Sequence, residues 1–233
     1  MAKKKIYEGK TKKLYATDNE NELLIEFKND VSYLNEGNKI TIKNKGAINN
    51  SISCHLFRYL SSYHIATHFI RQVSKKEMLV NKLEMIPLQV VTRNIASGNL
   101  VKRYGLEEGK ELECPVIEYY LKSVQIEDPL INKDHIVAFG HASSDELKEI
   151  HRAASKINVI LKDFFRRRKL KLVDFKLEFG RLGDKIVVGD ELSFDNFTFL
   201  DLETDKKLSV ESLYGKKEEL EKTYQKVNEL VMQ

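Results

Sequence analysis

Residues 173–180 read VDFKLEFG, and apolar and charged side chains alternate along this stretch. Strict alternation predicts a half-buried β-strand, because successive side chains of a strand point to opposite faces of its sheet. The apolar residues would share one face. Asp174, Lys176 and Glu178 would share the other face, with neighbours about 6.6 Å apart. A solvated strand more often carries Thr, Ser or Lys on its polar face, so an acid, a base and an acid in succession indicate a candidate site.

The sequence after this stretch supplies further acids. A turn at RLGD and the run KIVVGDEL, which contains Asp190 and Glu191, predict a hairpin with the first strand. If the turn holds an odd number of residues, Glu178 and Asp190 lie on the same face, close enough to share a cation. Two unpaired carboxylates at that distance repel each other, whereas Mg²⁺ is typically held by one or two carboxylates together with phosphates. Cross-strand surface ion pairs, with Lys176 between two acids, are the alternative interpretation, and spacing alone leaves both open.

Size and composition restrict the class of protein. A chain of 233 residues with 42% hydrophobic and 32% charged residues is expected to form one large domain or two small lobes. A formal net charge of +4 is low for a nucleic-acid-binding protein, so no nucleic-acid partner is expected. The two cysteines have no metal-ligand spacing, and no apolar run approaches the roughly 20 residues that span a bilayer. The N-terminus lacks the apolar stretch of a signal peptide, so we expect a cytoplasmic protein without a membrane partner.

The hydrophobic pattern predicts an α+β fold, in which strands, hairpins and helices are interleaved. The region before residue 46 has the short apolar runs of a β-rich segment, with a hairpin turn at 17–21. Helical periodicity predicts helices over about 47–63 and 217–232. Ser143 and Glu146 form a capping box at the start of the clearest helix.

Two stretches give weaker signals. Pro87 interrupts a strand-like run at 78–95, which predicts a bend there rather than one central strand. Residues 106–142 show no regular period, contain a turn-like Asp128-Pro129, and are expected to be irregular.

The motif GKTK at 9–12 suits phosphate groups. Lys10 and Lys12 would share one face of a strand, and Gly9 lets a ligand approach the backbone closely. The spacing of a Walker loop is absent, so an ordinary basic hairpin is the alternative.

A third candidate is TRNIASGNLVKR at 92–103. Arg93 and Arg103 flank a turn at Gly98 that opens a short helix. Backbone N–H groups and guanidinium groups together suit a phosphate or a carboxylate. A capped helix with neighbouring surface bases is the alternative.

In order along the chain, YEGKTKKLY, KLEMIP, TRNIASGNLVKR, EDP, VDFKLEFG and GDE resemble the SAICAR synthetase family, from about residue 6 to the C-terminus. The resemblance implies a two-lobed, ATP-grasp-like α+β fold with mainly antiparallel sheets. It implies a β-rich ATP-covering lobe at 1–85, an α+β lobe at 86–233 with the metal and substrate sites, and an active site in the cleft between the lobes. It also implies a homodimeric, Mg²⁺-dependent carbon–nitrogen ligase. This enzyme would join the carboxylate of CAIR, an aminoimidazole ribonucleotide, to L-aspartate and give SAICAR, with ATP consumed to ADP and phosphate through an acyl phosphate.

The same resemblance implies roles for individual residues. The implied set is, for ATP, Lys10, Thr11 and Lys12 at the phosphates and Lys82, Leu83, Glu84 and Met85 at the adenine; for Mg²⁺, Glu178 and Asp190; for CAIR and its neighbours, Arg93, Asn99, Asp128, Asp174 and Lys176. Those implied to be catalytic are Lys10, Lys176, Glu178 and Asp190. One strand face would then carry a substrate contact, a cation and a metal ligand in succession.

The chain departs from the family pattern at several positions. Asn99 replaces a serine and Gln89 a glutamate. In the run DELSFDNFTF, Phe194 replaces a proline and Thr198 stands where an arginine is expected. The stretch YLNEG at 33–37 also differs from the usual small-residue loop. Either a neighbouring base substitutes for the arginine, or the affinity for an anionic group is lower.

Three other interpretations stay open. A small-molecule kinase on the same ATP scaffold would release ADP without aspartate. A nucleic-acid-binding module would use the basic N-terminal hairpin and residues 166–171, and its binding would depend steeply on salt. A non-catalytic relative is the third, although the presence of Lys10, Lys176, Glu178 and Asp190 argues against it.

Overall fold

The computed structural model describes residues 4–32 and 39–233, so the unusual stretch at 33–37 lies outside the described residues. The chain divides into two compact units. Unit 1 contains the described residues up to Leu83 with Glu191–Asp195 and Leu208–Gln233; unit 2 contains Glu84–Asp190 and Asn196–Lys207. The C-terminal segment therefore belongs with the N-terminal part. The expected division into a lobe at 1–85 that covers ATP and a lobe at 86–233 that carries the metal and substrate sites stays a prediction.

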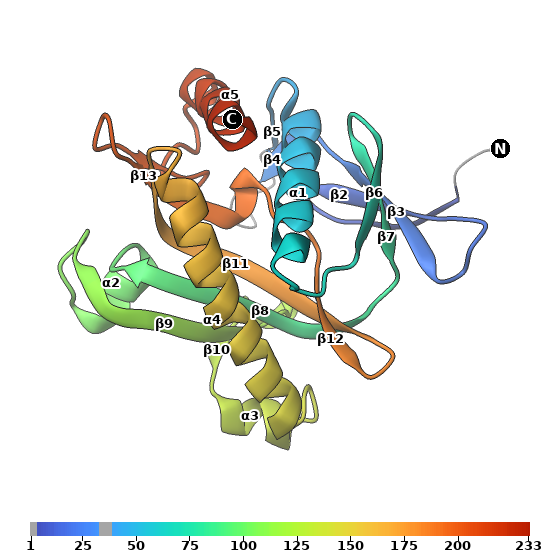
Figure 1. The fold of residues 1–233 in the computed structure, drawn as a ribbon. Coiled ribbons are helices and arrows are strands. Elements are labelled where there is room, and N and C mark those ends of the chain that lie inside the picture. Colours follow the sequence, from blue (N-terminus) through green and yellow to red (C-terminus); the bar gives the residue numbers. More distant parts are fainter. Residues whose placement is uncertain (1–3, 33–38) are drawn as a thin grey trace. The chain divides into compact units, whose positions relative to one another are not determined.

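Unit 1 is built on a five-stranded antiparallel sheet with two helices. Its elements are β1 (Lys5–Glu8), β2 (Lys12–Ala16), β3 (Glu22–Phe27), β4 (Asp30–Ser32), β5 (Lys39–Thr41), α1 (Lys45–Ser62), β6 (Phe69–Ser74), β7 (Glu77–Asn81) and α5 (Lys217–Met232). The strand order is β1-β2-β3-β7-β6, and β4 pairs with β5 separately. Helix α1 packs on β3, β6 and β7, and α5 packs on α1 (Figure 1). The predicted hairpin turn at 17–21 joins β2 to β3.

Unit 2 is built on a larger sheet with antiparallel strand pairs. Its elements, two of which extend into unit 1, are β8 (Glu84–Ile95), α2 (Asn99–Tyr104), β9 (Glu111–Leu121), the 3-10 helix η1 (Val124–Ile126), β10 (Leu130–Ile131), α3 (Lys133–Ala138), α4 (Ser144–Arg166), β11 (Leu170–Leu182), β12 (Lys185–Gly189), the 3-10 helix η2 (Phe194–Asn196), β13 (Phe197–Asp201) and β14 (Lys207–Leu208). The strand order is β10-β9-β8-β11-β13-β14, and β12 also pairs with β11. An α+β fold with antiparallel sheets is therefore confirmed.

Strand β11 contains VDFKLEFG, and its apolar face lies under α4. Phe175, Leu177 and Phe179 are each at most 1% exposed. Helix α4 packs on β11, β8, β9 and β12. It begins with the predicted capping box, because the Glu146 backbone N–H donates to Ser143 Oγ and the Ser143 N–H donates to the Glu146 carboxylate. The alternating stretch thus becomes the centre of the core of unit 2.

A buried amide pair fixes which face of the sheet α4 covers. Asn94 on β8 and Asn158 on α4 donate to each other's side-chain oxygen at 2.9 Å in both directions. Both residues are buried, so each amide satisfies the other away from water. The opposite face of β8 and β11 is left for polar side chains.

Two expectations differ from the structure. Strand β8 continues through Pro87 as a central strand, and a bulge stands where the bend was predicted. Glu178 of β11 pairs with Gln89 of β8, but Gly180, two residues further, pairs with Met85, so β8 has extra residues around Pro87. A bulge tolerates proline because it needs no ladder N–H there. The segment expected to be irregular contains β9, which pairs along β8. Among the described residues, no helix has the length and apolar character needed to cross a bilayer.

Candidate active site

The polar face of the unit 2 sheet brings together residues from three strands. Along β8 and β11, Arg93 lies opposite Asp174, Val91 opposite Lys176, and Gln89 opposite Glu178. On the other side of β8, Val91 lies opposite Glu118 and Gln89 opposite Tyr120 on β9. Since residues directly opposite each other in an antiparallel ladder share a face, all of these side chains share one. The predicted stripe of acid, base and acid is therefore part of a wider polar surface.

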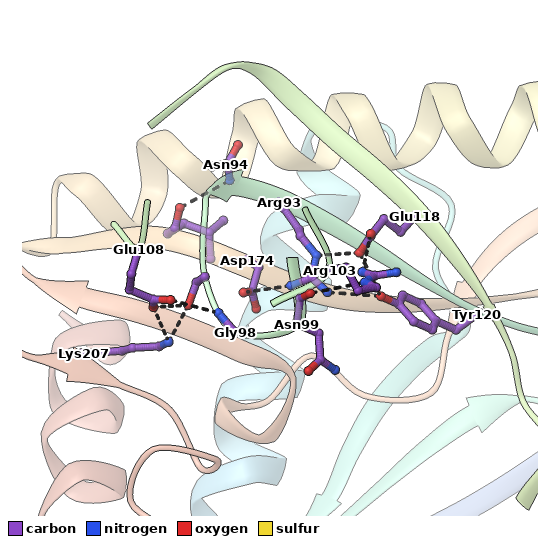
Figure 2. Close-up of polar contacts among 12 residues, drawn as sticks. Arg93, Asn94, Gly98, Asn99, Arg103, Glu108, Glu118, Tyr120, Asp174 and Lys207 are labelled. Carbon is purple, nitrogen blue, oxygen red and sulfur yellow. Dashed lines mark hydrogen bonds and ion pairs between the residues drawn. The ribbon is translucent and has the colours of Figure 1, made fainter. Parts of the chain in front are cut away.

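Glu118 is the centre of a charged cluster on this face. Its carboxylate accepts hydrogen bonds from Arg93 Nε and from an Arg103 terminal nitrogen, each at 2.6 Å. The Tyr120 hydroxyl donates to the same carboxylate at 3.0 Å and accepts from Arg103 at 2.7 Å. Figure 2 shows these four side chains converging. Burial opposes the charge of Arg93, but Glu118, Tyr120 and Asp174 together outweigh it, so the pKa of Arg93 is raised and the group stays cationic.

Asp174 lies at the other side of Arg93. An Arg93 terminal nitrogen approaches its carboxylate at 3.5 Å, and the Thr198 hydroxyl on β13 hydrogen-bonds to it. Burial raises the pKa of Asp174, although Arg93, Thr198, Lys176 and Lys207 oppose the rise. Thr198 thus contacts an acid at the position where the family pattern has an arginine, and the cations near that acid are Arg93, Lys176 and Lys207.

Glu178 and Lys176 differ sharply in their surroundings. The Glu178 carboxylate is 2.5 Å from Lys122 Nζ, and Glu178 is only 8% exposed. Lys176 is exposed. Its charge influences Asp174, but in the part of the chain that the structure describes it forms no salt bridge of 4 Å or less. The ion pairs of the alternative interpretation are present on this face, Arg93 with Asp174 and Lys122 with Glu178, but Lys176 is not the base that forms them.

The predicted partner of Glu178 lies just past a strand end. The β11–β12 turn holds two residues, an even number, so Glu178 lies opposite Gly189 rather than Asp190. At Asp190 the backbone φ is +60°, so strand alternation ends there and no longer fixes the side-chain direction. Among the described residues, no group of three His, Cys, Asp or Glu side chains is placed to hold a metal. A cation shared by Glu178 and Asp190 stays a prediction.

The turn before α2 forms a second cluster in unit 2, at the left of Figure 2. Glu108 accepts hydrogen bonds from Ser97 Oγ at 2.9 Å, from the Gly98 N–H at 3.3 Å and from Lys207 Nζ at 3.0 Å. Gly98 has φ +57° and ψ −125°, which glycine adopts far more readily than other residues. The predicted substrate residue Asn99 is exposed at the first turn of α2.

In unit 1 two residues of the GKTK motif contact Glu191. The Gly9 N–H donates to the Lys12 carbonyl oxygen at 2.9 Å, which closes a tight turn around an exposed Lys10. Thr11 Oγ1 donates to Glu191 Oε1 at 3.1 Å, and Lys12 Nζ lies 2.9 Å from the same oxygen.

The remaining predicted residues lie in connections. Lys82 and Leu83 end a part of unit 1, whereas Glu84 and Met85 begin β8. Asp128, with φ +46°, accepts a hydrogen bond from the Ser123 N–H at 2.6 Å.

Sequence reasoning missed Glu118, Tyr120 and Lys122, and it gave Glu191 no role in the site. The first three lie on or next to β9, in the segment that was expected to be irregular. The run IEYYLK has the spacing of two that would place Glu118, Tyr120 and Lys122 on one face, but only the pairing of β9 with β8 shows which face.

The chain matches a protein-family model and several relatives over nearly its whole length. The SAICAR synthetase model matches residues 5–231. A phosphoribosylaminoimidazole-succinocarboxamide synthase of Chloroherpeton thalassium is 48% identical over 227 residues, which are 97% of each chain.

Solved structures agree. The synthase from Ehrlichia chaffeensis has a TM-score of 0.94 at 36% identity and covers 98% of each chain. A SAICAR synthetase in complex with ADP has a TM-score of 0.92 at 39% identity, with 97% of this chain and 96% of that chain covered. By its sequence, its fold and its charged sheet face, the chain belongs to the SAICAR synthetase family.

Proposed function

We propose that the polar face of β8, β9 and β11 binds the aminoimidazole nucleotide in the reaction of this family. As a member, the chain is an ATP-dependent carbon–nitrogen ligase of de novo purine biosynthesis, which joins the carboxylate of CAIR to L-aspartate. The observation that carries the residue assignment is that Asp174, Lys176 and Glu178 share one sheet face with Arg93. A cation beside two acids of different burial can hold an anionic substrate and balance the charge that develops on it.

Arg93 and Asp174 are proposed to contact the nucleotide. Because Glu118 holds Arg93 Nε at 2.6 Å, the guanidinium has a fixed orientation for a phosphate or a carboxylate. Asp174 binds a proton more readily than an ordinary aspartate, since its pKa is raised by burial, and it suits a hydrogen bond to a ribose hydroxyl or an imidazole substituent. The exposed side chains of Asn99 and Asp128 are proposed to lie near the substrates.

Lys10, Thr11 and Lys12 are proposed to lie against the phosphates of ATP. A tight turn at Gly9 leaves the Lys10 side chain exposed, and a flexible ammonium group suits a phosphate as a point charge. The backbone of Lys82, Leu83, Glu84 and Met85 is proposed to read the adenine, in a lobe 1–85 that covers ATP.

Glu178 and Asp190 would hold Mg²⁺. Two carboxylates are the donor set that this ion takes beside phosphates. The buried Glu178 carboxylate already contacts a cation, Lys122, whose side chain is 43% exposed and able to move away. This contact fits a site that requires a positive charge. When bound, the ion would neutralise negative charge on the phosphate oxygens.

In this reaction the protein mainly positions the reacting groups and balances their charge. A carboxylate is a poor electrophile, so its oxygen first takes the γ-phosphoryl group and ADP leaves. The aspartate nitrogen then attacks the carbonyl carbon of the acyl phosphate, and phosphate leaves. Lys10 is proposed to balance charge on the transferred group, and the exposed Lys176 to balance charge on the reacting carboxylate.

A coupled assay for ADP tests this function. We expect ADP to form when CAIR and L-aspartate are both present. Equal ADP formation without aspartate would instead indicate a kinase. Salt-sensitive binding of RNA or DNA without ADP formation would indicate a nucleic-acid-binding protein.

Glu178→Gln tests the metal assignment, with Glu113→Gln, an exposed position on β9, as the control. We expect the first variant to lose turnover and to keep its circular dichroism spectrum, while the control keeps both. Near-normal activity of Glu178→Gln at saturating Mg²⁺ would refute the assignment.

We further propose a homodimer in the cytoplasm, as the family resemblance implies. Light scattering after size-exclusion chromatography measures the mass in solution. A monomer at assay concentrations would contradict the proposed dimer.

A further inference from the structure

The segment Glu191–Asp195 belongs to unit 1, although the chain on both sides of it belongs to unit 2. Leu192, Ser193 and Phe194 are 0% exposed. The two ends of the segment are carboxylates, and each is held by groups of unit 1. The segment is therefore fixed in unit 1 at its first and last residues.

Helices α1 and α5 hold the last residue. Asp195 Oδ2 lies 2.6 Å from Lys45 Nζ at the start of α1, and Asp195 Oδ1 accepts a hydrogen bond from the Tyr224 hydroxyl of α5. Lys45 and Tyr224 are both 0% exposed. The Phe194 ring meets the Tyr224 ring edge-on, with centroids 5.0 Å apart. Burial, followed by the nearby Asp195, raises the pKa of Tyr224, so its hydroxyl keeps the proton that it donates.

The first residue is held by the GKTK motif. Glu191 Oε1 contacts Thr11 Oγ1 and Lys12 Nζ, and Glu191 Oε2 accepts from Ser193 Oγ at 2.5 Å. Ser193 Oγ also accepts from the Asp195 backbone N–H at 3.2 Å. A continuous series of polar contacts thus runs from α5 through the segment to Lys12.

A buried ion pair is a costly way to join two helices to a segment. Apolar residues of similar volume often give equal or greater stability, because burying charges removes their hydration. Lys45 and Tyr224 fix the direction of the Asp195 carboxylate. Through Ser193, the same contacts fix the position of Glu191.

We propose that Tyr224 and Lys45 are positioning residues for nucleotide binding. They hold Asp195, which places Glu191 against Thr11 and Lys12 and so presents the GKTK turn to the phosphates of ATP. This inference rests on the proposed role of that turn. It gives the C-terminal helix a part in nucleotide affinity through Asp195 and Glu191.

Tyr224→Phe tests the proposal, because it removes the hydroxyl and keeps the ring that packs on Phe194. The control is Thr223→Val on the same helix, where the lost hydroxyl donates to the Glu219 carbonyl oxygen of its own helix. Both are compared with the wild type well below their melting temperatures. The measurements are ADP affinity by calorimetry with Mg²⁺ present, and the KM values for ATP and for CAIR.

We expect Tyr224→Phe to weaken ADP binding and to raise the KM for ATP about tenfold, the loss typical of a hydrogen bond to a charged group. The KM for CAIR should change less than about twofold, and Thr223→Val should resemble the wild type. Asp195→Asn, which keeps an acceptor for Tyr224 but loses the charge facing Lys45, should shift the ATP values in the same direction.

Three results would overturn the proposal. They are unchanged nucleotide affinity in folded Tyr224→Phe and Asp195→Asn, an equal change in the ATP and CAIR values, and failure of both variants to fold. The last two would assign the cluster a purely structural role. If the wild type itself binds no ADP, the proposed role of the GKTK turn fails instead, and this outcome is distinct from the others.

Discussion

Replacing Glu118 by Gln removes the closer of the two carboxylates that face the buried Arg93, at 2.6 Å against 3.5 Å for Asp174. Glu118 is 6% exposed and its carboxylate bridges Arg93, whose side chain is 9% exposed, and Arg103, whose side chain is 29% exposed. A glutamine keeps one acceptor oxygen, but its amide group brings N–H donors to face guanidinium donors. Arg103 can move into water, whereas Arg93 cannot.

The size of the effect follows from this difference in burial. Removing one partner of a buried ion pair costs about 3–5 kcal/mol. Since Arg103 can be rehydrated and Asp174 remains beside Arg93, we expect about 3 kcal/mol, the lower end of that range. For a chain of this length each kcal/mol lowers the melting temperature by about 2–4 °C, so Glu118→Gln should melt about 6–12 °C below the wild type. The KM for CAIR should also rise, because Arg93 loses the group that orients it.

Thermal unfolding followed by circular dichroism and initial rates at varied CAIR measure the two effects. Glu113→Gln makes the same chemical change on the same strand at an exposed position and should melt close to the wild type. Combining Glu118→Gln with Arg103→Met gives the coupling between the two side chains, which should be well below the loss caused by Glu118→Gln alone. A melting temperature and a KM for CAIR both equal to those of the wild type would refute the argument.

Two further substitutions test other parts of the fold. Gly46→Ala places a Cβ 2.4 Å from the Phe27 carbonyl oxygen, so the backbone must move. We expect the free energy of unfolding, measured with denaturant, to fall by about 1–3 kcal/mol. A fall of less than about 0.5 kcal/mol would contradict this contact. Arg181 lowers the pKa of Glu146 from 4.5 to about 2, and a lowered acid pKa contributes stability above 4.5 that is lost as the pH falls toward 2. Glu146→Gln should therefore have a melting temperature that falls less steeply with acidification across that window, and parallel curves for the two proteins would exclude this contribution.

Local chemistry made much of the fold predictable. The capping box at Ser143 and Glu146 depends on residues three apart, and the alternation in VDFKLEFG depends on residues two apart, so both are visible in a short window. Strand β9 was missed because Pro115 and several polar residues interrupt its pattern, and its partner β8 stabilises it through pairing at a distance in sequence.

The sequence predicted several residues of the candidate site, but it did not predict the contacts among them. The sequence indicated which residues of β11 share a face, but the burial of Glu118 depends on arginines from β8 and α2. Spacing left the parity of the β11–β12 turn open, and the two-residue turn places Gly189 opposite Glu178. Phe194, which departs from the family pattern, is a buried core residue that packs against Tyr224.

The run GDE lies where the chain passes from unit 2 to unit 1. Gly189 ends β12 opposite Glu178, Asp190 is the last residue of this part of unit 2, and Glu191 begins a part of unit 1. A non-glycine residue with φ +60° costs about 1 kcal/mol, and aspartate is among the few that adopt it readily. A glycine would relieve that strain but would remove the carboxylate. The strained residue Asp190 follows the end of β12, and the next residue, Glu191, contacts Thr11 and Lys12. The position is therefore better explained by the need for two successive carboxylates than by the stability of the turn.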